Sequence, residues 1–168
     1  MERWQDDIFQ AMLEARIEQV GYVPDAGHKA VIRACEADPG IEATVLTTEE
    51  EGIPLLVGAY LGGQRGVLLM QSSGVGNCIN LLGLPQLMGV PLPMLVTMRG
   101  EWAEFNGWQV PMGQATRPVL EAMGVIVYRA DRADEVGEIV QGAFEQAFNA
   151  ECAVAVLLGQ KLIGRKRW

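Results

Sequence analysis

Short apolar runs alternate with amphipathic segments along the whole chain. Apolar runs bounded by Gly, Pro or Asp predict buried strands over residues 21–24, 41–46, 66–70, 93–98, 125–128 and 153–158. Between them, apolar side chains at helical spacing predict helices over residues 8–20, 29–37, 75–88, 114–123 and 133–148, and a further helix from Glu50 onward. Buried strands separated by helices are typical of a parallel sheet covered on both sides. We therefore expect an α/β fold of three layers, in which a parallel sheet of about six strands carries helices on both faces.

Length and composition fit one globular unit. A chain of 168 residues, 49% of them hydrophobic, can fill one core and is too short for two domains of ordinary size. Because no linker interrupts the alternation of helices and strands, we expect residues 1–168 to form a single domain. The net charge of −8 argues against a general nucleic-acid surface, which would need clustered Lys and Arg.

Nothing in the sequence predicts export, membrane insertion or a metal site. Residues 1–7 are charged and amphipathic, unlike a signal peptide, and no apolar run reaches the length of a membrane span. Cys35, Cys78 and Cys152 lie in apolar segments at spacings that match no metal motif, so we expect buried free thiols. We expect a cytoplasmic protein.

Three adjacent acids, Glu49, Glu50 and Glu51, precede a helix that is apolar on nearly every face. One interpretation is that they compensate the positive end of the helix dipole. However, a helix so apolar must be buried on most sides, and its first acids then lie at the edge of a packed interior or a subunit contact. A carboxylate there is costly unless it binds a partner, so one of the three is expected to serve chemistry.

Residues 71–77 form a glycine-containing turn between a predicted strand and a predicted helix. The glycines permit a close backbone approach, but the turn matches neither phosphate-loop pattern, so a tight structural turn stays an alternative. Ligands of parallel sheets bind at the carboxyl ends of the strands. Here those ends are the loops at Pro24, Thr47, Gln71 and Arg99, which are expected to converge on one edge.

Four segments of the chain resemble a known family. They are Thr-Glu-Glu-Glu-Gly at 48–52 with Gly-Ala-Tyr at 58–60, Leu-Leu-Met-Gln-Ser-Ser-Gly-Val-Gly-Asn at 68–77, Met-Arg-Gly-Glu-Trp at 98–102 and Gln-Val-Pro-Met-Gly-Gln-Ala-Thr at 109–116. These motifs resemble the alpha subunits of sulfopyruvate decarboxylase and the similar N-terminal half of phosphonopyruvate decarboxylase. The resemblance runs from about residue 22 to residue 164. It implies the pyrimidine-binding domain of a thiamine-diphosphate-dependent 2-oxo acid decarboxylase.

The resemblance assigns roles around the cofactor. In these enzymes a glutamate hydrogen-bonds N1′ of the aminopyrimidine and promotes its imino tautomer, and Glu50 has the matching spacing to Gly52 and Tyr60. Glu50 is the catalytic candidate, and a partly buried, dry position would suit it. Glu49 and Glu51 are interpreted as solvated acids at the helix start. By resemblance, the loop beside the aminopyrimidine supplies the cofactor contacts Gln71, Ser72, Gly74 and Asn77, with Gln71, Ser72 and Asn77 facing the site.

Two loops are candidates for the substrate. The family commonly has Val-Pro-Asp-Ser after the first strand, and this chain has Ala26 where the serine would fall, but Asp25 can still face the site. His28, the only histidine, is a second catalytic candidate as a proton relay, with a cap or surface residue as the alternative.

The polar and aromatic segment 99–113 is typical of a functional loop. Arg99 can pair with a sulfonate or carboxylate through its planar fork, or else form an ion pair with Glu101 or Glu104. Gln109 and Gln114 are further candidates for polar contacts to the substrate, on the same grounds as Arg99.

The resemblance also implies a partner. Thiamine enzymes hold the diphosphate through Mg²⁺ on a separate domain that has a Gly-Asp-Gly motif and a downstream Asn, and neither occurs in this sequence. We therefore expect a beta subunit to bind the diphosphate and Mg²⁺ in a hetero-oligomer that shares the cofactor.

The expected reaction is decarboxylation of 3-sulfopyruvate to sulfoacetaldehyde and CO2. Phosphonopyruvate is the alternative substrate, because one tetrahedral anion replaces another, and other 2-oxo acids stay open. Two further alternatives are a catalytically silent or regulatory partner of a thiamine enzyme and a flavodoxin-like nucleotide-binding domain, which the alternating pattern alone permits.

Overall fold

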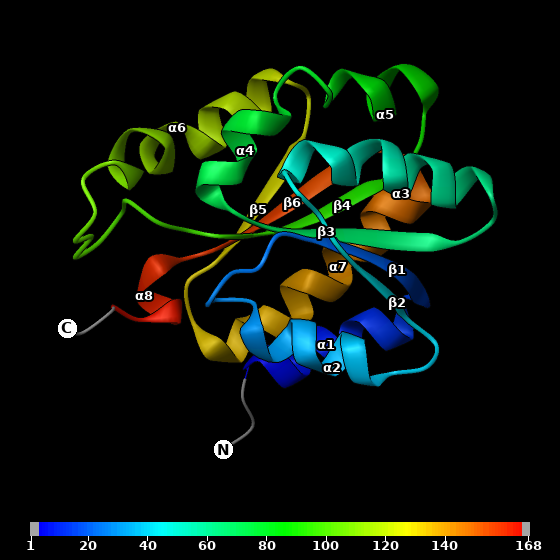
Figure 1. The fold of residues 1–168 in the computed structure, drawn as a ribbon, viewed down its shortest axis with the longest axis horizontal. Coiled ribbons are helices and arrows are strands. Elements are labelled where there is room, and N and C mark those ends of the chain that lie inside the picture. Colours follow the sequence, from blue (N-terminus) through cyan, green and yellow to red (C-terminus); the bar gives the residue numbers. More distant parts are fainter. Residues whose placement is uncertain (1–3, 166–168) are drawn as a thin grey trace.

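The computed structural model describes residues 4–165, which form one six-stranded sheet with helices on both faces (Figure 1). Residues 1–3, on which part of the expectation about a signal peptide rests, lie outside this range. The strands are β1 (Ile17–Tyr22), β2 (Glu42–Val45), β3 (Arg65–Gln71), β4 (Leu92–Thr97), β5 (Ile126–Ala130) and β6 (Ala153–Leu158). The α-helices are α1 (Trp4–Glu14), α2 (Lys29–Ala37), α3 (Gly52–Leu61), α4 (Ser72–Cys78), α5 (Gly83–Met88), α6 (Gln109–Ala122), α7 (Val136–Ala150) and α8 (Gln160–Ile163). Two short 3-10 helices, η1 (Glu49–Glu51) and η2 (Ala133–Glu135), precede α3 and α7.

All neighbouring strands are parallel, in the order β2-β1-β3-β4-β6-β5. Helices α1, α2 and α7 cover one face, and α3, α4, α5 and α6 cover the other (Figure 1). The predicted fold class is therefore confirmed. No helix within the described range is long and apolar enough to cross a lipid bilayer.

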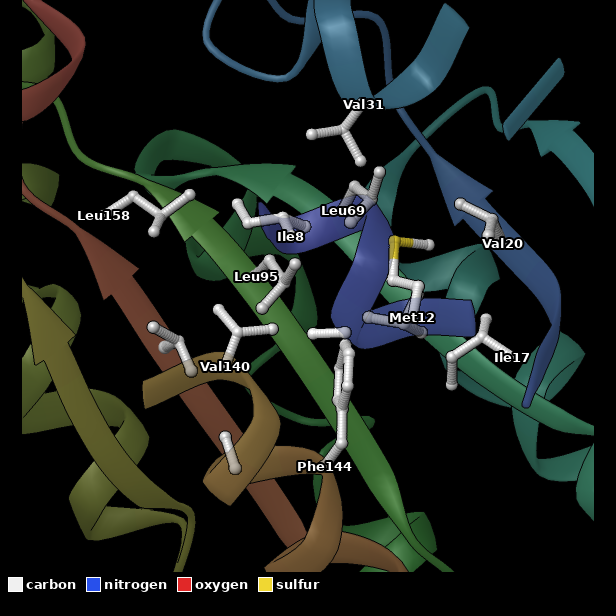
Figure 2. Close-up of a cluster of buried hydrophobic side chains, with 14 of the residues drawn as sticks. Ile8, Met12, Ile17, Val20, Val31, Leu69, Leu95, Val140, Phe144 and Leu158 are labelled. Atoms are coloured by element: carbon white, nitrogen blue, oxygen red, sulfur yellow. The ribbon is translucent and has the colours of Figure 1, made fainter. Parts of the chain in front are cut away.

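Each helix layer packs on the sheet through its own hydrophobic core. In the core under α1, α2 and α7, Met12 and Phe144 come from the helices, and Leu95 comes from the central strand β4 (Figure 2). Met94 and Val96, the neighbours of Leu95, belong to the opposite core. Because successive strand residues point to opposite faces, a strand buried on both sides needs an unbroken apolar run, which is the pattern that predicted it.

The predicted helix over residues 8–20 is wrong in its second half. Helix α1 ends at Glu14, Arg16 takes a left-handed backbone with φ 56°, and β1 begins at Ile17. Ile17 and Val20 continue the helical spacing by coincidence, because they are buried in β1 on either side of the exposed Glu18 and the partly buried Gln19.

Two other predicted helices differ in their boundaries. The helix over 75–88 is divided into α4 and α5 by a turn at residues 79–82, and Pro85 lacks the N–H that a continuous helix would need. Helix α6 begins at Gln109 rather than at residue 114, with Pro111 in the first turn, where its missing N–H has no partner to lose. Helix α8 was not predicted.

Candidate active site

Asp25, in the loop after β1, ties together the carboxyl ends of three strands. Its Oδ2 accepts hydrogen bonds from the Thr97 hydroxyl at 2.6 Å and from the Gly27 N–H at 3.1 Å. Its Oδ1 accepts one from the Gln71 side-chain amide at 3.0 Å, and Gln71 accepts one from the Ser73 hydroxyl at 3.0 Å. The predicted site residues Asp25 and Gln71 are therefore in direct contact, and Thr97 joins them.

His28 lies in the interior beneath this loop. Its side chain is fully buried, its Nε2 is 3.1 Å from the carbonyl oxygen of Leu95, and its Nδ1 has no hydrogen-bond partner within residues 4–165. Burial lowers the pKa of His28 although the charge of Asp25 acts to raise it, so the ring is neutral at neutral pH. The alternative of a surface residue is wrong, and the side chain makes no capping hydrogen bond. A proton relay through His28 stays a prediction that the geometry does not favour.

The three acids after β2 occupy different environments. Glu49 is only 8% exposed, and its carboxylate accepts a hydrogen bond from the Asn77 side-chain amide at 3.0 Å. Glu50 is exposed, so the partly buried position expected for it is wrong, and its side chain has no hydrogen-bond or ion-pair partner among the described residues. Glu51 is exposed as well, and its Oε2 accepts the Thr47 N–H at 2.8 Å. The interpretation of Glu49 as a solvated acid is therefore wrong, whereas Glu51 matches it.

The predicted turn over residues 71–77 is wrong, because helix α4 begins at Ser72, directly after β3. A glycine of this helix makes room for Glu49. A Cβ at position 74 would lie 2.3 Å from the carboxylate carbon of Glu49, so a side chain at Gly74 would collide with it. Ser72 does not face the site as expected. Its side chain is fully buried, and its hydroxyl accepts the Arg99 N–H at 3.0 Å, which joins the ends of β3 and β4. Asn77 is exposed and bonds to Glu49 through its amide.

Arg99 forms an ion pair at the end of β4. Its Nε and Nη2 donate to the two carboxylate oxygens of Glu104 at 2.7 and 2.5 Å. The same carboxylate accepts the N–H groups of Gly100 and Asn106 and the side-chain amide of Gln160. Mainly because of Arg99, the pKa of Glu104 is lowered from 4.5 to about 2. The ion-pair alternative is thus correct for Glu104.

The other two predicted contacts lie on α6. Gln114 donates from its side-chain amide to the Gly100 carbonyl at 2.9 Å, so it fixes the loop after β4. The side-chain oxygen of Gln109 is buried and has no partner within the described range. On the other side of the loop, Glu101 pairs with Arg129 at 2.5 Å. The loop is therefore held by polar contacts from both of its flanks.

A cavity of about 180 Å³ opens between the Asp25 loop, the loop after β4 and α8. Its polar and aromatic lining includes Asp25, Thr97, Arg99, Phe105, Gln160 and Arg165. The acids of η1 lie on the α3 and α4 side of the β3 end, whereas Asp25 leads into α2 on the opposite face (Figure 1). The predicted convergence on one edge of the sheet is confirmed, with β3 between the two clusters.

Sequence reasoning missed three residues of this region. Thr97 was inside a predicted strand, Gln160 was in no predicted element, and Glu49 was assigned to solvent. Thr97 and Gln160 follow or end strands at the carboxyl edge, so the rule that placed Asp25 and Arg99 would also have found them. Glu49 follows β2 at the same edge, but its burial could not be predicted, because it depends on a glycine 25 positions away in sequence.

The thiols and acids of the described residues form no metal site. Cys35 and Cys78 are buried free thiols as predicted, and Cys152 is partly exposed. Among residues 4–165, no group of three His, Cys, Asp or Glu side chains is arranged to hold a metal ion.

Comparison with known sequences gives close relatives, although no family model matches the chain. A sulfopyruvate decarboxylase subunit alpha from Methanococcus maripaludis is 37% identical over 152 residues, which are 90% of this chain and 91% of that protein. Its counterpart from Methanothermobacter thermautotrophicus is 36% identical over 153 residues, 90% of this chain and 92% of that protein. A phosphonopyruvate decarboxylase from Streptomyces viridochromogenes is 29% identical over 117 residues, 68% of this chain and 30% of that protein.

Among solved structures, the chain is similar to a 2-oxoglutarate:ferredoxin oxidoreductase from Magnetococcus marinus. The TM-score is 0.75 at 12% sequence identity, over 96% of this chain and 29% of the oxidoreductase chain. At that identity the similarity concerns the fold. The words "subunit alpha" in the names of the closer relatives imply that those proteins assemble with another subunit.

Proposed function

The chain belongs to the family of sulfopyruvate decarboxylase alpha subunits, and on that premise we propose that it is the pyrimidine-binding subunit of a thiamine-diphosphate-dependent decarboxylase. Its substrate is 3-sulfopyruvate, and the products are sulfoacetaldehyde and CO2. Residues 1–168 act as one domain of a cytoplasmic hetero-oligomer. The observation that carries the proposal is an exposed, unpaired Glu50 at the same sheet edge as the Asp25 cluster.

Glu50 has the properties that contact with an aminopyrimidine requires. An exposed carboxylate that no described residue engages is free to share a proton with a ring nitrogen. Glu50 precedes Gly52 by two positions and Tyr60 by ten, which is the family spacing. A cofactor carried by a partner would cover Glu50 and supply the dry environment that the isolated chain does not. When bound, thiamine diphosphate supplies a carbon nucleophile that adds to the substrate ketone and takes up the electron pair released with CO2.

The residues next to Glu50 fix the η1 turn from which its side chain extends. Glu49 bonds to Asn77, so the η1 turn is tied to helix α4, which follows β3 directly. Gly74 lets the Glu49 carboxylate pack against that helix. Ser72 fixes the helix to Arg99 from inside the protein. In this proposal, Gly74 and Asn77 border the cofactor and Ser72 supports them.

Asp25 and Gln71 form the substrate-facing side. The Asp25 carboxylate accepts three hydrogen bonds, from Thr97, Gly27 and Gln71, which hold it in one position. These bonds fix the loop after β1 across the end of β3, and they orient the Gln71 amide. Asp25 lines the cavity, so a substrate there meets an anchored carboxylate that accepts protons at a fixed place.

The diphosphate end of the cofactor is assigned to a partner. No described residues of this chain form a group fit for a metal ion, and the sequence has no Gly-Asp-Gly motif. We infer a beta subunit that binds the diphosphate through Mg²⁺ and brings the cofactor to Glu50. The words "subunit alpha" in the names of the relatives support such a partner.

Phosphonopyruvate is the second candidate substrate, because a phosphonopyruvate decarboxylase matches 68% of the chain. One experiment separates the candidates. The tagged protein is isolated from its native cells, its partner is identified by mass spectrometry, and the complex is assayed with both 2-oxo acids. A partner with a Gly-Asp-Gly motif and CO2 release from 3-sulfopyruvate would support the proposal. Release from phosphonopyruvate alone would favour the second candidate, and isolation without any such partner would refute both.

A further inference from the structure

The loop after β4 is organised around one buried carboxylate. The Glu104 side chain is only 4% exposed, and it accepts five N–H bonds: two from Arg99, one each from the Gly100 and Asn106 backbone, and one from Gln160. Burying a charge is costly unless it is paired and hydrogen-bonded, and here both conditions are met. Glu104 therefore holds the loop after β4 in one conformation.

Gln160, at the start of α8, connects this carboxylate to the backbone of the loop. Its side-chain oxygen accepts the N–H groups of Glu101 and Trp102, both at 2.9 Å, and its amide donates to Glu104 at 2.9 Å. Gln160 is itself buried, with 5% of its surface exposed. A side chain without an amide at this position would leave the N–H groups of Glu101 and Trp102 without this acceptor, and would remove one of the three hydrogen bonds that Oε2 of Glu104 accepts.

The result of this network is a fixed position for Arg99. Helix α6 holds the loop from the other flank, through Gln114 and through the packing of Gly113, where a Cβ would lie 2.0 Å from the Arg99 carbonyl oxygen. The Phe105 ring lies beside the guanidinium, with its centroid 5.3 Å from the guanidinium carbon. The Arg99 side chain is 15% exposed, and Arg99 lines the cavity.

Arg99 keeps donors for a ligand. A guanidinium has five N–H donors, and two of them are bonded to Glu104, which leaves three. Since the Arg99–Glu104 pair carries no net charge, attraction of an anion comes from a second cation that lines the cavity, Arg165. Arg165 has no ion pair with another described residue. Asp25 lines the cavity as well, and it would repel an anion placed close to it.

We propose that this cavity binds the sulfonate end of the substrate through Arg99 and Arg165, and that Glu104 and Gln160 are positioning residues that hold the Arg99 fork toward it. This inference rests on the proposed function and adds the subsite that selects a second anionic group. The cavity volume of about 180 Å³ is many times the roughly 10–15 Å³ that one water needs on the same measure, so a sulfonate can enter. The sulfonate lies toward the two arginines, and the reacting ketone lies toward Asp25.

The test measures binding with a probe that cannot react. 3-Sulfopropanoate keeps both anionic groups of 3-sulfopyruvate and lacks the ketone, and propanoate lacks the sulfonate as well. Titration calorimetry on the isolated complex is carried out with the wild type, Glu104→Gln and Gln160→Ala. We expect both variants to bind 3-sulfopropanoate roughly tenfold more weakly, as the loss of one charged hydrogen bond predicts, and to bind propanoate as the wild type does.

Controls separate positioning from general destabilisation. Glu121→Gln breaks an exposed Arg–Glu pair with Arg117 on α6, and it should leave 3-sulfopropanoate binding unchanged. Arg99→Lys keeps the charge without the fork, so it should weaken binding by a similar factor even if Glu104→Gln does not fold. In kinetics with 3-sulfopyruvate, the variants should raise KM roughly tenfold with little change in kcat.

The outcomes distinguish this inference from the proposed function. Variants that bind 3-sulfopropanoate as tightly as the wild type would overturn the subsite, even if the complex decarboxylates 3-sulfopyruvate. A complex that does not decarboxylate 3-sulfopyruvate, but loses 3-sulfopropanoate binding in Glu104→Gln and Gln160→Ala, would refute the proposed function and support a sulfonate site.

Discussion

The Thr97 hydroxyl donates a 2.6 Å hydrogen bond to the Asp25 carboxylate, so the loop after β1 is anchored to β4 across the end of β3. The side chain between them, Gln71, comes from β3 and bonds to the other oxygen of Asp25. Three neighbouring strands thus share one carboxylate. Such an arrangement fixes the site geometry before any ligand binds.

Thr97→Val should therefore loosen the Asp25 loop. Valine has nearly the same shape but no donor, and Thr97 is buried, so the unfolding free energy should fall by about 1.5–3 kcal/mol, the range for a hydrogen bond to a charged group. Urea denaturation measures the change. Thr97→Ser keeps the hydroxyl and should lose much less stability than Thr97→Val. Equal losses would show that the methyl group, not the hydrogen bond, matters here.

Gly74→Ala should destabilise the protein through Glu49. The new Cβ would lie 2.3 Å from the Glu49 carboxylate carbon, and such overpacking typically costs about 1–3 kcal/mol. Gly83→Ala is a matched control, because nothing lies within 4 Å of its Cβ position.

A double-mutant cycle identifies the cause of this loss. In the background Glu49→Ala the obstructing carboxylate is absent, so Gly74→Ala should then cost much less. Additive effects in thermal or urea unfolding would contradict the close contact between these two residues.

Stability should depend on pH through Glu104. Its pKa in the folded protein is lowered to about 2, so the carboxylate stabilises the fold above its ordinary pKa of 4.5. This contribution is lost as the pH falls from 4.5 toward 2, because the folded state must then take up the proton at an unfavourable site. Unfolding free energies measured across that range should fall more steeply for the wild type than for Glu104→Gln. Parallel curves would mean that Glu104 does not carry the lowered pKa.

The cysteines should differ in reactivity. The thiols of Cys35 and Cys78 are buried, and burial raises their pKa values to about 12. Burial also raises the pKa of Cys152, which is partly exposed. At a pH of about 8, iodoacetamide should modify Cys152 slowly and the other two only after unfolding, because the thiolate is the reactive form. Rapid alkylation of Cys35 or Cys78 in the folded protein, read by peptide mass spectrometry, would contradict this packing.

Strands in the interior of the sheet were predictable because they are buried on both faces. The unbroken apolar runs of β4 and β6 have no other simple explanation. The boundary between α1 and β1 was not predictable in this way, because β1 contains the polar Glu18 and Gln19, and its apolar Ile17 and Val20 suit both a helix and a strand. The pattern of apolar residues does not show where the helix ends. In the structure, the left-handed backbone of Arg16 marks that boundary.

The sequence predicted which loops form the candidate site, but it predicted fewer of the contacts between their side chains. The carboxyl-edge rule located Asp25, Gln71 and Arg99. It did not indicate that Glu49 is buried or that His28 lies in the interior, because both facts depend on packing between distant segments. The Gln160 contacts were missed for the same reason, since they join positions 59 and 58 residues apart.

In the proposed complex this chain supplies the glutamate of a thiamine-diphosphate decarboxylase. This role is tested most directly by the rate of CO2 release from 3-sulfopyruvate by the isolated complex, with the wild type and Glu50→Gln. We expect Glu50→Gln to reduce kcat by about 10²–10⁴, the usual contribution of a positioned acid or base, with unfolding free energy within about 0.5 kcal/mol of the wild type because Glu50 is exposed. Glu51→Gln, at the neighbouring exposed acid, should retain activity. Full activity of Glu50→Gln would contradict the account and favour a catalytically silent subunit.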